Sequence, residues 1–181
     1  WEALMRSLID TGWVITSSAP IESEATQSMH QKGKASAASS ILLSCRKRSY
    51  EERLPTVWLG VDGSGVLQQV KEAVRDGLVE LESLKLNPVD EMVASYGRAL
   101  KVLSEAWPVM DGDDLVSPVK AMKEASLVVN QYQISRLTNG RIRIGDLDPE
   151  SAMALTAYGV FGLTWFDYDE ALNMSRSLGT S

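Results

Sequence analysis

The spacing of apolar residues changes from a strand-like to a helical pattern near Ser49, and this change constrains the fold more than any motif does. Before it, residues 13–17 and 40–46 are rich in β-branched, aromatic and aliphatic side chains, which predicts two strands. The run at 40–46 is almost continuously apolar, which is typical of a strand buried on both faces of a sheet. A helix over residues 2–11, with Gly12 at its stop position, is expected to precede both strands.

After that point, apolar residues recur at steps of three and four, which predicts helices. The first of these helices spans about twenty residues and is defined by Val66, Val70, Ala73, Val74, Leu78 and Leu81. Three later helices are each marked by a capping side chain followed by proline, at Asn87-Pro88, Ser117-Pro118 and Asp148-Pro149. Proline suits the first helical position because the N–H that it lacks would have no intrahelical partner there.

Two weaker patterns complete the second part of the chain. The alternation at 141–144 is typical of a short strand, although only four residues support it. Beyond the helix that begins at Asp148-Pro149, the pattern predicts a last short helix near residues 169–178.

The predicted fold class is therefore α+β, mostly α. Two strands are marginal as an isolated sheet, and Pro20 is expected to turn the first strand into an irregular or edge segment. The strand pair is therefore interpreted as the edge of a larger sheet. We expect residues 1–48 to form this edge, residues 49–65 to form a linker or hinge, and residues 66–181 to form an all-helical domain.

Composition excludes several classes of protein. The chain has 181 residues, of which 44% are apolar and 23% are charged, and this balance is that of a globular protein rather than a disordered one. No apolar run approaches the roughly 20 residues of a membrane-spanning helix, so no membrane partner is expected. The single cysteine allows no internal disulfide, which fits a reducing compartment, and the predicted location is the cytoplasm.

Charge is unevenly distributed. Residues 1–48 hold six basic and four acidic residues, whereas residues 49–181 hold twelve basic and twenty acidic residues. No acidic residue occurs between positions 25 and 50. The basic residues of that stretch are the candidate nucleic-acid-binding residues, namely Lys32, Lys34, Arg46, Lys47 and Arg48. The alternative is a solvated basic loop without a ligand.

Other candidate sites have structural explanations. His30 has no neighbouring carboxylate or nucleophile in the sequence, and Cys45, in an apolar strand, is expected to be a buried structural thiol. The acidic segment at 111–114 lacks the glycine and glutamate spacing of a calcium loop and is interpreted as a solvated turn. The glycines of segment 60–65 are interpreted as a hinge rather than a phosphate-binding loop, because no second parallel strand is expected after the next helix.

Taken together, these segments resemble a known family. The matching residues are Gly12-Trp13-Val14-Ile15-Thr16, Pro20-Ile21-Glu22-Ser23-Glu24, the segment 38–46, and Asp90, Ala94, Gly97, Arg98, Ala99, Leu100 and 104–109, followed by the Ser117-Pro118 helix and 148–163. They resemble the carboxy-terminal part of adenine-specific DNA methyltransferases, large S-adenosylmethionine-dependent proteins often described as carrying a zinc ribbon. The resemblance implies the last helix and closing strand pair of a Rossmann-like methyltransferase sheet, followed by a helical accessory domain.

The resemblance also shows what this chain lacks. Neither the glycine-rich turn that holds S-adenosylmethionine nor the Asp/Asn-Pro-Pro-Tyr/Phe segment that receives the adenine occurs here, and the zinc-ligand cysteines have no counterpart. The resemblance therefore implies no catalytic, cofactor-binding or metal-binding residue in this chain. The expected function is that of a carboxy-terminal fragment, inactive alone, with S-adenosylmethionine and DNA bound through the parent enzyme.

The alternative interpretation is a free-standing, non-enzymatic helical module. In that case Trp107, Trp165 and Phe166 would serve its core, and its acidic face would bind a protein partner. The two interpretations differ in whether methyl-transfer chemistry accompanies the chain.

Overall fold

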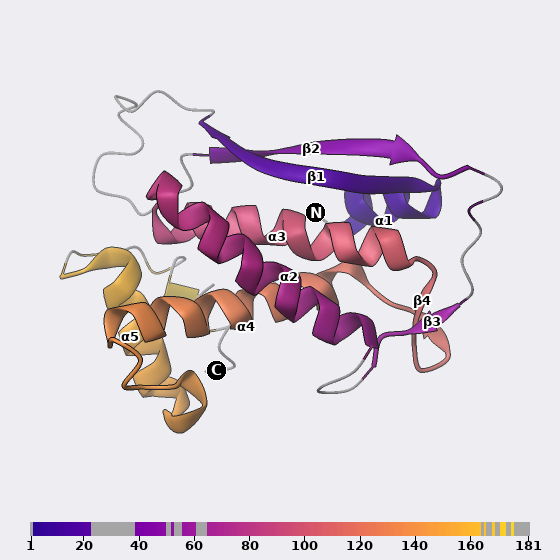
Figure 1. Cartoon of the computed structure of the whole chain (residues 1–181). Coiled ribbons are helices and arrows are strands. Elements are labelled where there is room, and N and C mark those ends of the chain that lie inside the picture. The colour runs from indigo at the N-terminus through magenta and orange to yellow at the C-terminus, as the bar shows by residue number, and fades with distance from the viewer. Residues whose placement is uncertain are drawn as a thin grey trace.

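In the computed structural model, the described residues are 2–22, 39–49, 52, 56–60, 65–163, 165, 168, 171, 172 and 175. The structure is α+β and mostly helical, as the sequence predicts. A two-stranded sheet lies on one side of the molecule, and the helices lie beneath it (Figure 1).

The first part of the chain forms a helix and an antiparallel strand pair. Helix α1 (Glu2–Asp10) leads through Gly12, with φ +83°, into β1 (Trp13–Glu22), which pairs with β2 (Ser39–Lys47). A β-bulge interrupts the register of β1 between Ile15 and Ser17. Strand β1 is longer than the predicted 13–17, because pairing with β2 keeps the chain extended through Pro20 to Glu22, where the sequence carries little strand signal.

The prediction that β2 is buried on both faces is wrong. Its residues alternate between half-buried and exposed, and Leu42 is 54% exposed. Cys45, predicted to be a buried structural thiol, is half-buried and packs against the smaller core cluster. The physical reason is that α3 covers only one face of the pair, while the run Ile41-Leu42-Leu43 places apolar side chains on both faces.

The helical part contains α2 (Gly65–Leu81), α3 (Pro88–Ala106), α4 (Pro118–Leu137) and α5 (Pro149–Phe161), with short 3-10 turns η1 (Glu82–Leu84) and η2 (Ile144–Asp146). All three predicted cap-proline starts are confirmed. The side chain of each capping residue accepts a hydrogen bond from a backbone N–H in the first turn of its helix. Asn87 accepts from the N–H of Asp90, Ser117 from the N–H of Val119, and Asp148 from the N–H of Ser151. These bonds satisfy amides at each helix start that have no intrahelical partner.

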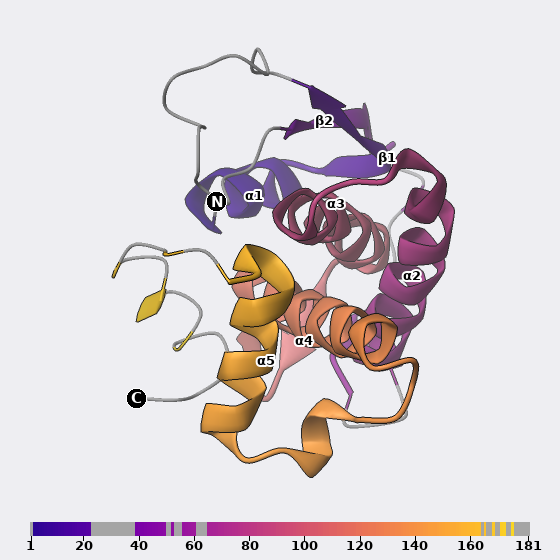
Figure 2. The same cartoon turned by 90° about the vertical axis from the view of Figure 1, so that its left-hand side faces the viewer.

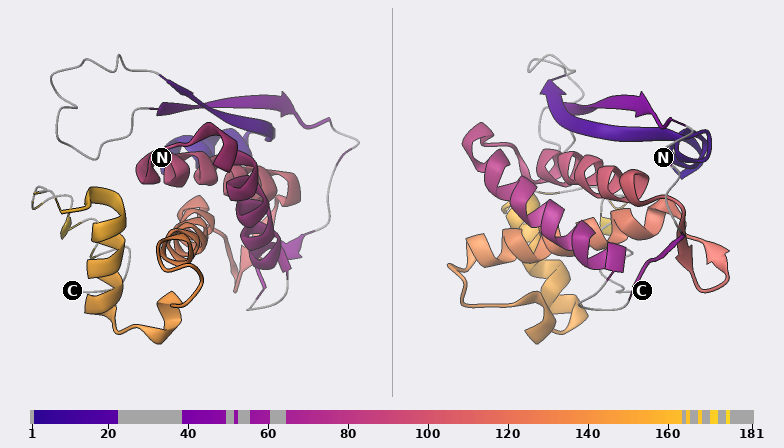
Figure 3. Two further views of the ribbon diagram at one scale, coloured as in Figure 1. Left: turned by 60° about the vertical axis from the view of Figure 1, so that its left-hand side comes forward. Right: turned by 45° about the vertical axis from the view of Figure 1, so that its right-hand side comes forward.

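Helix α3 is the central element, lying between the sheet and α4 (Figure 2). Its residues Ala99 and Leu103 join the larger core with α2 and α4, while Leu100 packs with Met5 of α1 and Ile15 of β1 in a smaller cluster. Because both sides of α3 are covered, residues outside its predicted apolar stripe, such as Ser95 and Ser104, are buried as well. Helix α5 packs on α4 at the periphery (Figure 3).

A second, small sheet lies at the opposite end of α2 from η1. Strand β3 (Val57–Trp58) pairs in parallel with β4 (Val109–Asp111), which forms a hairpin with β5 (Asp114–Leu115). Residues 66–181 are therefore not all helical. The hairpin strands have only two or three residues, too few for a periodic pattern to reveal them.

Two predictions for the last third of the chain are wrong. Residues 141–144 form no strand, because Ile144 instead begins the 3-10 turn η2. Trp165, which the alternative interpretation assigns to the core, is 96% exposed. Phe166 and most of the predicted helix at 169–178 lie outside the described residues.

The boundaries predicted at residues 48 and 65 remain predictions. The two sides of residue 48 share side-chain contacts, since Ile9 belongs to the larger core together with residues of α2, α3 and α4. Among the helices that the structure describes, none is long and apolar enough to span a bilayer.

Candidate functional site

The candidate nucleic-acid-binding residues divide between the basic end of β2 and a segment that the structure does not describe. Lys32 and Lys34, like His30, lie outside the described residues. Arg46 is exposed, and its Nη1 lies 2.6 Å from Oε2 of Glu52 in an ion pair. Lys47 places its ammonium nitrogen 5.8 Å from the ring centroid of Trp13, a cation–π geometry.

Arg48 makes the most extensive contacts of the three described candidates. Its Nη2 donates to the backbone oxygens of Ser104, at 2.6 Å, and Glu105, at 3.2 Å, in the last turn of α3. Those carbonyls have no intrahelical donor and carry the negative end of the helix dipole, so a guanidinium there stabilises the helix end. Arg48 is therefore held by the protein itself, whereas Lys47 keeps its charge at the surface.

Ser104 also joins α3 to the sheet at the bulge of β1. The backbone N–H of Ile15 donates to Ser104 Oγ at 2.9 Å, and Ser104 Oγ donates to the carbonyl of Lys101 at 2.9 Å. One turn of α3 thus supplies both a partner for the bulged strand and the carbonyl that Arg48 contacts. The basic end of the sheet is rigidly attached to α3 through these bonds.

Among the residues that the structure describes, the strand pair leaves one face exposed. Its inner face rests on α3, where Gly97 allows such close approach that an added Cβ would lie 2.5 Å from Ser18 Cβ. The outer face carries small or apolar residues, including the opposed pairs Ala19 with Leu42 and Ile21 with Ser40. Within the part of the chain that the structure describes, no third strand pairs with β1 or β2.

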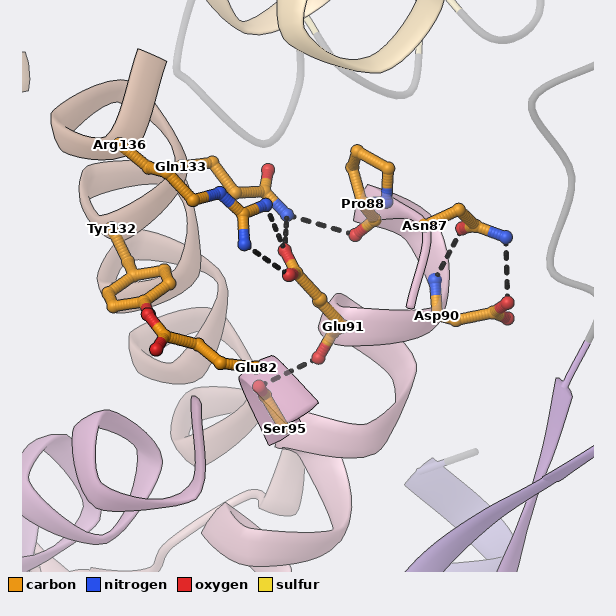
Figure 4. Close-up of polar contacts among 9 residues, drawn as sticks. All are labelled: Glu82, Asn87, Pro88, Asp90, Glu91, Ser95, Tyr132, Gln133 and Arg136. Atoms are coloured by element: carbon orange, nitrogen blue, oxygen red, sulfur yellow. Dashed lines mark hydrogen bonds and ion pairs between the residues drawn. The ribbon is translucent and has the colours of Figure 1, made fainter. Parts of the chain in front are cut away.

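A buried polar cluster, which sequence reasoning did not find, joins α3 to α4 (Figure 4). Glu91 has a side chain only 6% exposed and accepts two hydrogen bonds from Arg136, at 2.7 and 3.0 Å. Gln133 Nε2 donates to Glu91 Oε2 and to the carbonyl of Pro88, both at 3.0 Å. The only sequence signal is the spacing of Gln133 and Arg136, which places both on one face of a helix.

The same cluster extends to the end of α2 through Tyr132 and Glu82, which are hydrogen-bonded (Figure 4). Burial of Tyr132, with the hydrogen bond and charge of Glu82, raises the pKa of its phenol to about 12. The hydrogen bonds that Arg136 donates to Glu91 raise the pKa of the Arg136 guanidinium. Every charged member thus has a partner of opposite charge or a hydrogen bond, and the cluster is a structural link between helices.

The two described ends of the glycine segment between β3 and α2, Gly60 and Gly65, lie close together. Gly65 has φ +68°, and an added Cβ would lie 2.9 Å from Gly60 Cα. The amide of Leu67, in the first turn of α2, donates to the carbonyl of Leu59 at 2.9 Å and is therefore occupied. As expected, another helix, α3, follows α2, although β4 after α3 pairs in parallel with β3. Residues 61–64 lie outside the described residues.

The acidic segment 111–114 is an exposed hairpin turn, as predicted. Asp111 forms an ion pair with Lys120 at 2.6 Å, and this pair balances the charge of the Asp111 carboxylate. No group of three or more His, Cys, Asp or Glu residues suited to a metal ion occurs in the described ranges.

Comparison of the chain with models of protein families, with curated proteins and with solved structures finds no match. Any function must therefore be argued from the residues and contacts described above.

Proposed function

We propose that this chain is the carboxy-terminal part of an S-adenosylmethionine-dependent DNA adenine methyltransferase. In this proposal α1, β1 and β2 complete the Rossmann-like catalytic sheet, and the helical part is its accessory domain. The cofactor, the target adenine and the catalytic residues belong to the preceding part of the enzyme, so the chain alone transfers no methyl group.

The observation that carries this proposal is the incomplete sheet. The order helix, strand, antiparallel strand matches the unit that the resemblance implies at the end of a methyltransferase sheet. Its outer face is exposed and no described strand pairs with either edge, and an open sheet edge is a template for a further strand. A sheet continued by the preceding part of the enzyme satisfies both facts.

The contacts of α3 support a bracing role for the helical part. The sheet rests on α3 through the close approach at Gly97, the bond from Ile15 to Ser104, and the contacts of Arg48. A helix attached in this way holds the strand pair in place. We therefore propose bracing, rather than an independent clamp on DNA, as the contribution of α2 to α4.

The experiment that tests the proposal is a methyl-transfer assay. The full-length protein, supplied with radiolabelled S-adenosylmethionine and adenine-containing DNA, is expected to label the DNA, and residues 1–181 alone are not. A full-length protein whose sequence lacks the glycine-rich turn and the Asp/Asn-Pro-Pro-aromatic segment, and which labels no DNA, would overturn the proposal.

DNA contact by the basic residues is a separate part of the proposal. In the full-length protein, replacing Lys32 and Lys34 with Gln is expected to weaken DNA binding and to reduce the dependence of affinity on salt concentration. The matched control replaces Arg75 and Lys85, two exposed basic residues outside the acid-free stretch. Equal affinities and salt slopes for the two double variants would remove this contact.

A non-enzymatic interaction module is the second candidate, and exposed apolar residues near the carboxy terminus favour it. Leu163, Trp165 and Tyr168 are 94%, 96% and 76% exposed. Exposed aromatic residues of this kind are enriched in protein interfaces. A full-length protein without methyl-transfer activity, in which Trp165→Ser abolishes binding to a purified protein partner, would favour this candidate over the enzyme.

A further inference from the structure

Helix α4 is followed directly by the one Asn-Gly pair of the sequence, Asn139-Gly140. An asparagine side chain is open to attack by the backbone nitrogen of the next residue, and glycine hinders this attack least because it has no Cβ. The other asparagines have less reactive neighbours or less room. Asn87 is followed by proline, which has no N–H, Asn130 is 2% exposed inside α4, and Asn173 is followed by methionine.

The same two residues close the end of α4. Asn139 has φ +52° and Gly140 has φ +74°, and asparagine and glycine are the residues that adopt this left-handed region most readily. We refer to residues 138–140 as the α4 cap. The residue types that suit the backbone of the cap are therefore also the pair whose side chain and amide can react with each other.

The α4 cap restrains the reacting nitrogen. The N–H of Gly140 donates to the carbonyl of Ser135 at 2.7 Å, so this bond must break before the nitrogen can lose its proton and turn toward Cγ of Asn139. Asn139 itself is exposed, so water reaches its amide. Helix ends open locally in a fraction of molecules at equilibrium. The rate of attack is then set by the fraction of molecules in which the cap is open.

We propose that Asn139 is deamidated by water and that opening of the α4 cap sets the rate. In the open cap, the nitrogen of Gly140 gives its proton to hydroxide and bonds to Cγ of Asn139. The bond from Cγ to Nδ2 breaks, and Nδ2 leaves as ammonia after taking a proton from water. Water then breaks the bond from the ring nitrogen to either carbonyl carbon of the succinimide and returns a proton to the nitrogen, which leaves isoaspartate or aspartate. The reaction uses only this chain and water, so it does not depend on the proposed function.

Peptide mass spectrometry of the full-length protein tests the proposal. Trypsin cleaves after Arg136 and Arg141 and releases residues 137–141, so the state of Asn139 is followed on one short peptide. At neutral pH, Asn139 is expected to deamidate at least about 10-fold more slowly in the native protein than in denaturant. Equal rates in the two states, or no deamidation of Asn139 in denaturant, would overturn the proposal.

A threonine variant separates opening of the cap from the chemistry. Thr138 Oγ1 donates to the carbonyl of Ile134 at 2.8 Å, and Thr138→Val removes this bond. Native deamidation of Asn139 is expected to become about 5-fold faster, the effect of one lost hydrogen bond, while the rate in denaturant stays the same. The matched control is Thr11→Val, which removes the bond from Thr11 Oγ1 to the carbonyl of Ser7, 2.7 Å long, at the end of α1. A native rate in Thr138→Val no higher than in this control would overturn the role of the α4 cap.

The product is expected to weaken the cap that delays the reaction. Isoaspartate places an extra carbon in the main chain between residues 139 and 140, and its carboxylate lies at the negative end of the helix dipole. In protein aged at neutral pH, the amide of Thr138, which donates to the carbonyl of Ile134 at 3.0 Å, is expected to exchange with solvent faster in the isoaspartate fraction than in the unmodified fraction. Equal exchange in the two fractions would overturn this consequence.

Discussion

Gly97 is the residue on which the close packing of α3 against the sheet depends. An added Cβ would lie 2.5 Å from Ser18 Cβ and 2.6 Å from Ser18 Oγ, well inside van der Waals contact. The helix does not need glycine for its own conformation, since glycine is less favourable than alanine in a helix interior. Glycine at position 97 is explained by β1, because Ser18 of that strand leaves no room for a Cβ.

We expect Gly97→Ala to lower the free energy of unfolding by about 1–2 kcal/mol, because overpacking outweighs the gain in helix propensity. Urea denaturation measures the effect. Adding Ser18→Gly removes the clashing atoms and is expected to restore most of the loss. Gly145, with no atom within 4 Å of an added Cβ, gives the control Gly145→Ala. A Gly97→Ala protein as stable as the Gly145→Ala protein would contradict the packing argument.

Tyr132 is the residue whose ionisation is most clearly changed by the fold. Burial and Glu82 raise the pKa of its phenol to about 12, above the ordinary value of 10.0. Because the folded pKa is the higher one, the stabilisation is complete below pH 10 and is lost as pH rises through 12. We expect stability to fall less steeply over this range in Tyr132→Phe than in the unaltered protein. Urea denaturation at a series of pH values tests this, and parallel profiles would contradict it.

At the scale of elements, the end of α3 is stabilised by a residue from a distant segment. Arg48 contacts two carbonyls of the last turn, whereas its neighbour Arg46 makes an exposed ion pair with Glu52. We expect Arg48→Met to lower the free energy of unfolding by about 1–2 kcal/mol, and Arg46→Met by less than about 0.5 kcal/mol. Chemical denaturation compares the two. Equal losses would show that Arg48 is no more important to α3 than a surface charge.

The link between α3 and α4 is expected to depend on Glu91. Replacing it by Gln keeps its shape but weakens both bonds from Arg136. The Arg136 side chain is 45% exposed, so water can solvate its guanidinium when the bonds to Glu91 weaken. We therefore expect the free energy of unfolding to fall by about 1–2 kcal/mol, less than the cost of leaving a fully buried charge without a partner. Glu105→Gln, which breaks an exposed pair with Lys101, is the control and should cost under about 0.5 kcal/mol.

At the scale of the whole molecule, the sheet and the helices share their cores. Met5 and Ile15 pack with Leu100 of α3, and Ile9 packs with the larger helical core. We therefore expect residues 1–48, produced alone, to show a random-coil circular dichroism spectrum, because a two-stranded sheet is marginal without a packed face. The intact chain provides the reference. A cooperative thermal transition in the isolated segment would show that it folds without α3.

Much of the element structure was predictable from the sequence, because the signals are local. The starts of α3, α4 and α5 follow from capping side chains and prolines that act within one turn, and the length of α2 follows from its apolar spacing. The candidate site was less predictable. The sequence indicates Arg46, Lys47 and Arg48 as one basic group, but only the fold pairs Arg46 with Glu52 and directs Arg48 to α3.

The sequence by itself determined the fold class, the helix starts and the two long strands, since capping, proline geometry and apolar periodicity act between near neighbours. Tertiary structure alone decided that β2 is covered on one face, that Ser104 and Glu91 are buried, and that short strands β3 and β4 pair. These features depend on contacts between residues distant in the chain, which place α3 between the sheet and α4. Local pattern carries no information about such contacts, because burial is decided by whichever element packs against each face.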